Sequence, residues 1–393
     1  MPSPSIIRLL VVARWPLGGI RTYMKYTYKY FPRDRFRITL LAPQEGEEAA
    51  LAQDMEEMGI AWVKADRVAG RNFLCGRIFQ LLARQRFDVI QSQGFISAVH
   101  VHAANLFHNI PHVVTVHGIL EDKYLGKGLL GKLKLKWLQQ VINSAAVLYA
   151  VSRDMQEHVE SLLHIRKGLR KVVIHNGIDV SRFAGKELIE VTSLRMKLGI
   201  PDTAFLVGYL GRFMPQKGFE YLIDAMDILT KRNHGSRDVR VLAVGSGDYL
   251  EAYKKKVTTK KLGDKFIFMP FQPDVAPVYN AADIIVMPSV WEAFGLQAAE
   301  ALSMGRPIMV SDCIGLREAV KDTPALVVPT GDAPAIADVL SRLLLEPPSA
   351  LFHDFQEEAR KRFDVRNTAF ELQALLISVA SGTGLTQKEH LTA

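Results

Sequence analysis

Short apolar runs alternate with amphipathic stretches along the chain, and each run has the length of a buried strand. In the first half they span residues 6–13, 38–42, 88–92, 112–117, 146–151 and 171–175. After a polar connection the pattern starts again at residues 206–211, 239–245, 266–269, 284–287, 308–312 and 325–329. Buried strands separated by helices are typical of parallel sheets that are covered on both faces. The pattern therefore predicts two successive α/β domains.

The same pattern sets the expected domain limits. We expect an N-terminal domain over residues 1–185 and a C-terminal domain over residues 186–364. Residues 365–380 have the apolar spacing of a last amphipathic helix, which we expect to cross back to the N-terminal domain. Residues 381–393 are expected to form a tail.

One segment carries an acidic residue at the end of a predicted strand. The apolar run that ends at Met287 stops at Pro288, and an alanine-rich helix follows that Gly305 closes. Glu292 lies in the loop between them, and ligands of open α/β sheets bind outside the carboxyl ends of the strands. Taken alone, however, Glu292 is better explained as a favourable charge near a helix start.

A second acid in this segment, Glu300, is harder to explain without a ligand. It lies among alanine and leucine residues, where burial of an unpaired charge is costly, so it needs a polar partner. About two helical turns separate Glu292 from Glu300, which corresponds to roughly 10 Å along the axis. The two acids therefore suit different parts of one extended ligand.

Composition narrows the classes of protein. With 393 residues, of which 48% are hydrophobic, the chain is long enough for two domains with separate cores. Its two cysteines, Cys75 and Cys313, have no metal-ligand spacing, which argues against a disulfide framework and a structural zinc site. No signal-peptide pattern and no apolar run near the roughly 18 residues of a membrane span is found. We therefore expect a cytoplasmic protein.

Positive charge is concentrated in the first half of the chain. Residues 1–185 contain 25 Lys and Arg against 15 Asp and Glu, a net charge of +10, whereas residues 186–393 contain 24 against 26, a net charge of −2. An excess confined to one half indicates an anionic partner there. No nucleic-acid-binding motif is recognisable, so we expect no nucleic-acid partner.

Three motifs after predicted strands each have two interpretations. Gly18 and Gly19 lie between a strand and a helical stretch, where backbone amides can approach phosphate oxygens, but a tight turn explains them equally well. His117 ends a strand, where a hydrogen-bonded structural histidine is as common as a ligand contact. Gly245 belongs to half of a dinucleotide fingerprint and indicates a tight turn.

Two cations follow the first strand of the second domain. Arg212 and Lys217 lie in the sequence Gly-Arg-Phe-Met-Pro-Gln-Lys-Gly at residues 211–218. They could be solvated surface charges. At the carboxyl end of a strand, such a pair could also hold an anionic group through charge-assisted hydrogen bonds.

Together these motifs resemble those of the retaining glycosyltransferases of family 4. Residues 292–300 resemble the Glu-x7-Glu signature of that family, and Arg212 and Lys217 match its Gly-Arg and Lys-Gly positions. His117 and the following glycine are similar to its His-Gly motif. The resemblance covers nearly the whole chain. It implies a GT-B fold, in which two Rossmann-like domains face a central cleft, with the acceptor on the N-terminal side and the nucleotide sugar on the C-terminal side.

The resemblance also implies roles for individual residues. Arg212 and Lys217 would neutralise the donor diphosphate, Glu292 would orient the transferred sugar, and Glu300 would accept ribose hydroxyls. His117 would approach the sugar from the other domain. The implied catalytic residues are His117, Arg212, Lys217 and Glu292, and the implied donor-binding residues are Gly18, Gly19, Gly245, Phe294, Gly295, Leu296 and Glu300. Phe271, Gln272 and Pro273 replace the family's usual glycine loop, which leaves recognition of the base open.

The implied activity is transfer of a sugar from a nucleotide sugar to a glycan or lipid-linked acceptor, with retention of configuration. It is a hexosyltransferase activity of EC class 2.4, of the kind used in polysaccharide biosynthesis. No cofactor and no metal are expected, since the chain contains no Asp-x-Asp motif. A sugar-nucleotide epimerase of the same architecture and an inactive nucleotide-sugar-binding subunit remain alternatives.

Two basic stretches of the N-terminal half suggest a membrane partner. Lys127, Lys132, Lys134 and Lys136 alternate with leucines and Trp137, and residues 23–30 combine tyrosines with lysines. Each stretch could be an ordinary amphipathic helix packed on its sheet. Basic and aromatic residues side by side also suit an anionic bilayer. We therefore expect peripheral contact with the inner face of a membrane through the N-terminal domain.

Overall fold

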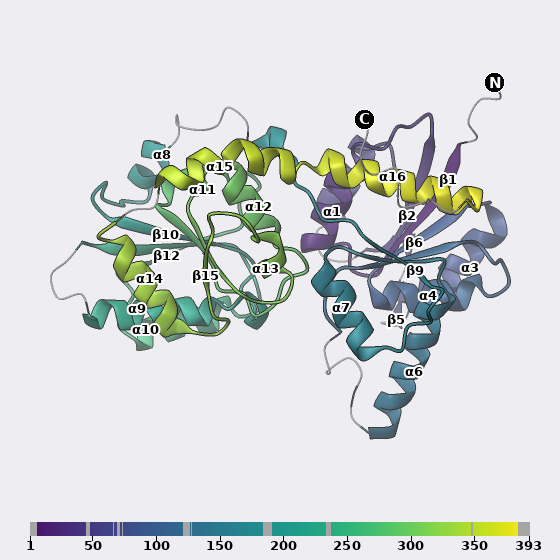
Figure 1. Cartoon of the computed structure of the whole chain (residues 1–393), viewed down its shortest axis with the longest axis horizontal. Helices are drawn as coiled ribbons and strands as arrows, with labels where there is room; N and C mark the ends of the chain where they lie inside the picture. The colour runs from purple at the N-terminus through teal and green to yellow at the C-terminus, as the bar shows by residue number, and fades with distance from the viewer. Residues whose placement is uncertain are drawn as a thin grey trace. The chain divides into compact units, whose positions relative to one another are not determined.

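The structure is a computed structural model that describes most of the chain (Figure 1). The described residues are 6–44, 48–65, 67–68, 71–72, 74–120, 126, 128–183, 191–232, 237–346 and 349–383. The chain forms two compact units. The N-terminal unit comprises the residues up to Gly177 and those from Val365 onward, and the C-terminal unit comprises Ile178–Asp364.

The N-terminal unit is built on a parallel sheet of seven strands in the order β3-β2-β1-β6-β7-β8-β9. Most positions of the central strands are buried, as expected for a sheet covered on both faces. The strands are β1 (Ile7–Ala13), β2 (Phe36–Pro43), β3 (Ala61–Ala65), β6 (Val89–Gln93), β7 (His112–Val116), β8 (Val147–Ala150) and β9 (Arg170–Val173). The helices are α1 (Gly18–Tyr28), α2 (Glu48–Glu57), α3 (Leu74–Arg84), α4 (Phe95–Asn105), α6 (Gly128–Ser144), α7 (Arg153–Leu162) and α16 (Val365–Ser381).

Sequence patterns missed three strands of this unit. β3 has only one buried position, so it lacks the continuous apolar run of the other strands. β4 (Arg67–Val68) and β5 (Arg71–Asn72) form a two-residue antiparallel pair that is too short to leave a periodic pattern.

The C-terminal unit repeats this plan with six parallel strands in the order β12-β11-β10-β13-β14-β15. Every predicted strand of this half is present within two residues of its expected limits. The strands are β10 (Phe205–Leu210), β11 (Val239–Val244), β12 (Phe266–Met269), β13 (Ile284–Met287), β14 (Ile308–Ser311) and β15 (Leu326–Val328). The helices are α8 (Val191–Lys197), α9 (Phe219–Arg232), α10 (Leu250–Thr259), α11 (Ala276–Ala281), α12 (Leu296–Ser303), α13 (Leu316–Ala319), α14 (Ala333–Leu343) and α15 (Ser349–Arg362).

Each sheet has one point at which the strand order reverses. In the N-terminal unit it lies between β1 and β6, and in the C-terminal unit between β10 and β13. At such a point the loops that follow the two neighbouring strands diverge, which leaves a crevice in which α/β proteins bind ligands. The structure therefore provides one expected ligand position in each unit.

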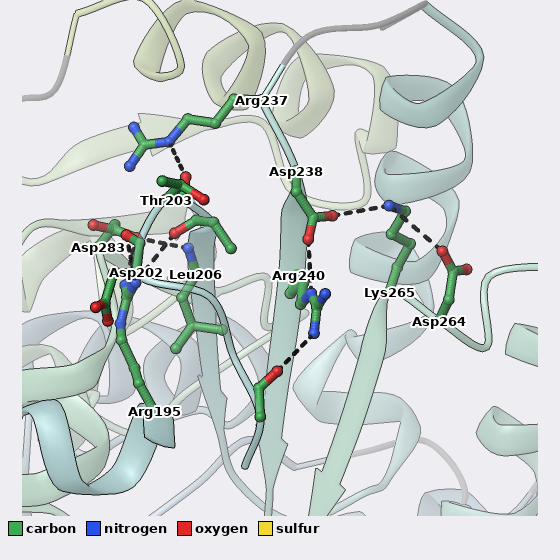
Figure 2. A network of polar contacts seen from close by, with 12 residues as sticks. Arg195, Asp202, Thr203, Leu206, Arg237, Asp238, Arg240, Asp264, Lys265 and Asp283 are labelled. Atoms are coloured by element: carbon green, nitrogen blue, oxygen red, sulfur yellow. Dashed lines mark hydrogen bonds and ion pairs between the residues drawn. The ribbon is translucent and has the colours of Figure 1, made fainter. Parts of the chain in front are cut away.

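The amino ends of the strands in the C-terminal unit carry a polar network with a structural role (Figure 2). Buried Arg195 of α8 donates to the carbonyl oxygens of Ala281 and Ala204 at 2.8 and 3.2 Å, and to Asp283 Oδ2 at 2.8 Å. Asp283 Oδ2 also accepts from the Leu206 amide at 2.7 Å. One guanidinium thus ties α8 and α11 to the start of β10, at the end of the sheet opposite the expected ligand position.

The domain boundary differs from the expected one at residue 185. Gly177 already marks the end of the first segment of the N-terminal unit, because Ile178 pairs with Asp364 and its amide donates to the Phe363 carbonyl at 2.8 Å. The returning helix, α16, belongs to the N-terminal unit. Its Gln373 donates to the Tyr30 carbonyl at 3.0 Å. Residues 384–393 of the expected tail lie outside the described residues.

The basic stretches expected at a membrane behave differently. In the first stretch, Tyr23 and Tyr26 are buried core residues of α1, so these two rings are not available to a bilayer, and Lys25 pairs with Asp54 at 2.6 Å. In α6 the first turns are exposed, and Figure 1 shows them projecting away from the sheet of their unit. Lys127 lies outside the described residues. Among the described residues, no helix is long and apolar enough to cross a membrane.

Candidate active site

The turn after β10 is joined to the loop after β13 by a close backbone approach. Gly218 has a φ of +64°, and a Cβ atom there would lie 1.8 Å from the carbonyl oxygen of Pro288. Beside it, the Val290 amide donates to the Gln216 carbonyl at 2.8 Å, and the Gln216 side chain donates to the Trp291 carbonyl at 3.1 Å. Only glycine tolerates both this conformation and this contact. The two loops at the reversal point are therefore held together.

This junction brings two of the predicted residues into direct contact. Lys217 Nζ lies 2.7 Å from Glu292 Oε1, and the Ser289 hydroxyl donates to the same oxygen at 2.8 Å. The Glu292 side chain is 9% exposed and that of Lys217 is 21% exposed, so the ion pair is largely shielded from water. In the part of the chain that the structure describes, both hydrogen-bond donors to this carboxylate engage Oε1. Oε2 therefore remains as an acceptor for a ligand.

Arg212 lies in the same loop as Lys217 but has a different environment. Its side chain is exposed, and the described residues include no hydrogen-bond or ion-pair partner for its guanidinium. Only its backbone carbonyl is engaged, by the Tyr209 hydroxyl at 3.3 Å. Arg212 is thus a solvent-accessible cation at the carboxyl end of β10, next to the reversal point.

Gly245 has a structural reason to be glycine. A Cβ atom there would lie 1.9 Å from the Gly211 carbonyl oxygen, so the loops after β10 and β11 could not approach each other. The Gly245 amide donates to the Met269 carbonyl at 3.0 Å, which leaves no N–H for a phosphate oxygen. The structure places Gly245 beside the site as a packing residue and does not support a direct backbone contact with the donor.

Residues 294–296 form the entrance to α12. Gly295 has a φ of +92° and precedes the helix, which begins at Leu296. A Cβ atom on Gly295 would lie 2.5 Å from Leu316 Cδ1, so glycine is required here as well. Phe294 is buried, with its ring centroid 6.3 Å from that of Phe363. The helix therefore starts four residues after Glu292, and buried Phe294 anchors the loop between them in the core.

Glu300 lies on α12 and is 8% exposed. The Tyr279 hydroxyl of α11 donates to Glu300 Oε2 at 2.8 Å, which supplies the polar partner that the sequence required. Burial raises the pKa of Glu300 to about 7, although the Tyr279 hydrogen bond and the charge of Arg182 oppose the rise. Among the described residues, Oε1 of this carboxyl group has no hydrogen-bond partner, so the ionised group can accept hydrogen bonds from a ligand there.

The N-terminal unit places its own candidates at the carboxyl end of its sheet. Gly18, with a φ of +55°, and Gly19 begin α1 after β1, and a Cβ atom on Gly19 would meet nothing within 4 Å. His117 follows β7. Its Nε2 lies 2.6 Å from Gln93 Oε1, and burial lowers its pKa to about 3. The imidazole is therefore neutral at physiological pH.

The structure thus sorts the predicted residues by unit. Arg212, Lys217, Glu292, Gly295 and Glu300 lie around the β10/β13 reversal point and α12, whereas Gly18, Gly19 and His117 belong to the N-terminal unit. The described residues contain no group of three or more His, Cys, Asp or Glu residues that could hold a metal ion.

Sequence reasoning missed the residues that support these side chains. Tyr279 and Gln93 act through packing between elements, so no local motif identifies them. Gln93 did leave one signal, since the sequence Gln-Ser-Gln is unusual in a central strand of a parallel sheet, where apolar residues dominate.

Comparison with known proteins supports the resemblance found in the sequence. The pattern described as "Glycosyl transferases group 1" matches residues 190–362, and "Glycosyltransferase Family 4" matches residues 17–182. A D-inositol 3-phosphate glycosyltransferase of Saccharomonospora viridis is 30% identical over 308 residues, which cover 72% of this chain and 70% of the relative. The chain belongs to glycosyltransferase family 4. It is a transferase of EC class 2.4, and the epimerase and the inactive subunit are not favoured.

Two further comparisons place this glycosyltransferase among its relatives. An Escherichia coli UDP-Gal:alpha-D-GlcNAc-diphosphoundecaprenol alpha-1,3-galactosyltransferase is 25% identical over 325 residues, covering 81% of this chain and 82% of the relative. The structure of HepE from Anabaena, in complex with UDP and glucose, has a TM-score of 0.81 at 21% identity and covers 95% of this chain and 100% of HepE. The predicted GT-B fold is confirmed.

The raised pKa of Glu300 predicts a pH-dependent effect of Glu300→Gln on stability. Glu300 has a pKa of about 7 in the folded protein, above its ordinary 4.5. The contribution of the protonated carboxyl group to the free energy of unfolding is therefore complete below about pH 4.5 and is lost as the pH rises through 7. The loss amounts to about 3 kcal/mol at most. Relative to the wild type, Glu300→Gln should therefore be more stable at pH 8.5 than at pH 4.5, as measured by urea unfolding of the full chain.

A charge-matched control is Glu251→Gln on α10, whose side chain is 81% exposed. Because an exposed ion pair such as that of Glu251 with Lys254 contributes about 1 kcal/mol or less, this variant should change the free energy of unfolding little at either pH. If Glu300→Gln also gave the same difference from wild type at pH 4.5 and pH 8.5, Glu300 would not titrate in a buried site.

Proposed function

We propose that this glycosyltransferase moves a sugar from a nucleotide sugar to its acceptor with retention of configuration and without a metal ion. The observation that carries the proposal is the shielded Lys217–Glu292 ion pair beside exposed Arg212 at the β10/β13 reversal point. It combines two cations for a leaving diphosphate with an acid for the sugar, within two loops that glycine packing holds together.

The cations have different tasks. Arg212 is accessible and binds diphosphate oxygens through its planar set of N–H donors, which suit such oxygens. Lys217 has three N–H donors, of which one holds Glu292 and the others bind the diphosphate. Each charge-assisted hydrogen bond contributes about 1.5 to 3 kcal/mol. Positive charge fixed in advance stabilises the negative charge that develops on the leaving group, which is the work a metal ion performs elsewhere.

The two acids bind different parts of the donor. Ser289 and Lys217 hold Glu292 by Oε1, so its Oε2 accepts a hydroxyl of the transferred sugar. Tyr279 holds Glu300 by Oε2, so its Oε1 accepts the ribose hydroxyls. In the N-terminal unit, His117 is the proposed hydrogen-bond partner for a sugar hydroxyl, and the open space at Gly19 leaves room for a ligand beside the backbone.

The acceptor is a lipid-linked or other glycan. The E. coli relative uses a diphosphoundecaprenol-linked acceptor, and α6 of this chain presents a surface suited to the membrane that carries such molecules. Leu129, Leu130 and Leu133 are 75%, 64% and 55% exposed, and Lys132, Lys134 and Lys136 are exposed beside them. We call these six residues the α6 surface.

The packing of α6 explains why this surface is left uncovered. Its buried positions are Gly131, Leu138, Val141 and Ile142, most of which lie in the second half of the helix. Trp137 marks the limit of the packed part, with its ring centroid 5.5 Å from that of His102. The helix carries no acidic residue, so leucines can enter the headgroup region while lysines pair with anionic lipids. The α6 surface is the observation that supports our proposal of peripheral contact with the inner face of the membrane, next to a lipid-linked acceptor.

Arg212→Met tests the proposed donor site. The variant should lower kcat by about 100-fold or more, because a group that stabilises the leaving diphosphate is lost. Its thermal unfolding midpoint should stay at the wild-type value, since the side chain is exposed. Arg237→Met is the matched control, because Arg237 is exposed in the same unit at the amino end of β11 and should leave kcat unchanged. Wild-type turnover by Arg212→Met would refute the assignment.

The α6 surface predicts salt-sensitive binding to anionic vesicles. Each lysine near such a surface contributes about 1 kcal/mol, so Lys132→Gln, Lys134→Gln and Lys136→Gln together should weaken vesicle binding by about 100-fold. Co-sedimentation with vesicles of phosphatidylglycerol and phosphatidylcholine measures this effect, and binding by the wild type should fall as salt rises.

The charge-matched control for vesicle binding replaces three exposed lysines of the C-terminal unit, Lys197, Lys255 and Lys261, by glutamine. This variant should sediment like the wild type. If both triple variants lost binding equally, the attraction would come from net charge and not from the α6 surface. No sedimentation of the wild type would leave a soluble acceptor as the better interpretation.

A further inference from the structure

A chain of buried polar side chains ends at His117. Gln93 Nε2 donates to the Tyr28 hydroxyl at 2.8 Å, and this hydroxyl donates to Gln91 Oε1 at 3.0 Å. Gln91 Nε2 in turn donates to Thr115 Oγ1 at 2.9 Å. These four residues are between 0% and 3% exposed and come from α1, β6 and β7. We call them the Gln93 relay.

The direction of the relay determines which atom Gln93 presents to His117. Because its Nε2 is used by Tyr28, its Oε1 faces His117 Nε2 at 2.6 Å. A carbonyl oxygen only accepts, so the hydrogen of the imidazole must be on Nε2. The neutral ring has a single N–H, which means that its other nitrogen, Nδ1, carries a lone pair.

The surroundings of His117 keep it neutral and in place. Burial lowers its pKa to about 3, so the imidazolium form is not populated at physiological pH. The Tyr23 ring of α1 packs edge-on against the imidazole at a centroid distance of 4.7 Å. Among the described residues, the titratable side chain in ring contact with the imidazole is Tyr23, while Tyr28 is bonded to Gln93 and Tyr149 to Tyr23. Burial raises the pKa of all three phenols, so none is charged, and the charge of Glu371 in α16 acts on Tyr149.

We propose that Gln93 is a positioning residue that holds His117 as the Nε2–H tautomer, so that Nδ1 accepts a hydrogen bond from a hydroxyl of the sugar. This proposal rests on the proposed function of His117 as a sugar contact. The opposite tautomer would place a donor at Nδ1, and the sugar hydroxyl would then have to accept. The tautomer thus follows from the orientation of the Gln93 amide, whose Nε2 is bonded to Tyr28 and whose Oε1 faces His117.

The relay also explains the polar sequence of β6. A central strand covered on both faces would normally be apolar, and each buried amide must be hydrogen-bonded to avoid a desolvation cost. Both glutamines meet that condition. Tyr28 is a hydrogen-bond partner of Gln91 and of Gln93, and Thr115 is a second partner of Gln91. The two glutamines of β6 thus belong to one chain of hydrogen bonds, which leads to Nε2 of His117.

Nitrogen NMR of the full chain tests the tautomer directly. In protein labelled with ¹⁵N-histidine, His117→Asn identifies the His117 signals, and the wild type should show a protonated Nε2 and an unprotonated Nδ1 without donor present. Gln93→Met removes the acceptor and should give a mixture of tautomers. A wild-type spectrum with the hydrogen on Nδ1, or an unchanged tautomer in Gln93→Met, would overturn the proposal.

Gln93→Glu provides a functional readout that a purely structural role would not move. The carboxylate beside Nε2 favours the imidazolium, so His117 should gain a second N–H, lose its acceptor and acquire a pKa within the measurable range. Transfer should then fall about 10- to 100-fold at pH 6 and recover as the pH rises, whereas the wild-type rate should show no titration of this histidine. An identical pH profile for Gln93→Glu and the wild type would contradict the proposal.

Tyr149→Phe is the matched control for disturbance of the same core. It removes a buried hydrogen bond, from the Tyr23 hydroxyl to the Tyr149 hydroxyl at 3.3 Å, which is not one of the hydrogen bonds that form the Gln93 relay. It should lower stability while leaving the His117 tautomer and the pH profile unchanged. If the wild type transferred no sugar at all, the proposed function would fail and the sugar contact with it, whereas the tautomer seen by NMR would stand independently.

Discussion

The site in the C-terminal unit depends on close backbone contacts that only glycine permits. Gly218 lies against the Pro288 carbonyl, and a Cβ atom on Gly315 would lie 2.0 Å from the Glu292 carbonyl oxygen. These contacts hold the loops after β10, β13 and β14 together at the point where the strand order reverses. Lys217 and Glu292, which lie in two of these loops, form an ion pair at 2.7 Å. Lys217 and Glu292 are therefore held against each other by contacts within this unit, whereas the Arg212 side chain is exposed to solvent.

Much of the fold could be predicted because parallel sheets leave long apolar signals. The strands of the C-terminal unit and the central strands of the N-terminal unit follow the apolar runs within a few residues. The boundary at Gly177 could not be predicted, because it depends on the pairing of Ile178 with Asp364, far apart in sequence. The tyrosines of α1 were misjudged for a related reason. Whether an aromatic residue on an amphipathic helix faces the core or a partner is settled by packing.

The identities of the site residues came from motifs, whereas their partners did not. Local sequence identifies the candidates Arg212, Lys217, Glu292 and Glu300. It does not predict the contact between Lys217 and Glu292, because they are 75 positions apart. For Gly245 the motif was a poor guide to the role. The sequence resembles half of a dinucleotide-binding motif, but glycine is needed there because the backbone lies close to the Gly211 carbonyl oxygen. The supporting residues Tyr279 and Gln93 become visible only when α11 packs on α12 and when α1 packs on β6.

The central claim is that the cations after β10 hold a nucleoside diphosphate without a metal ion. Isothermal titration calorimetry of the full chain with a panel of nucleoside diphosphates, in excess chelator, tests it most directly. The account predicts that at least one of them binds with a stoichiometry of one per chain, and that Arg212→Met weakens its affinity about 10- to 150-fold, as expected for the loss of a charge-assisted hydrogen bond. Binding that appears only after a divalent metal ion is added, or equal affinity in Arg212→Met, would contradict it.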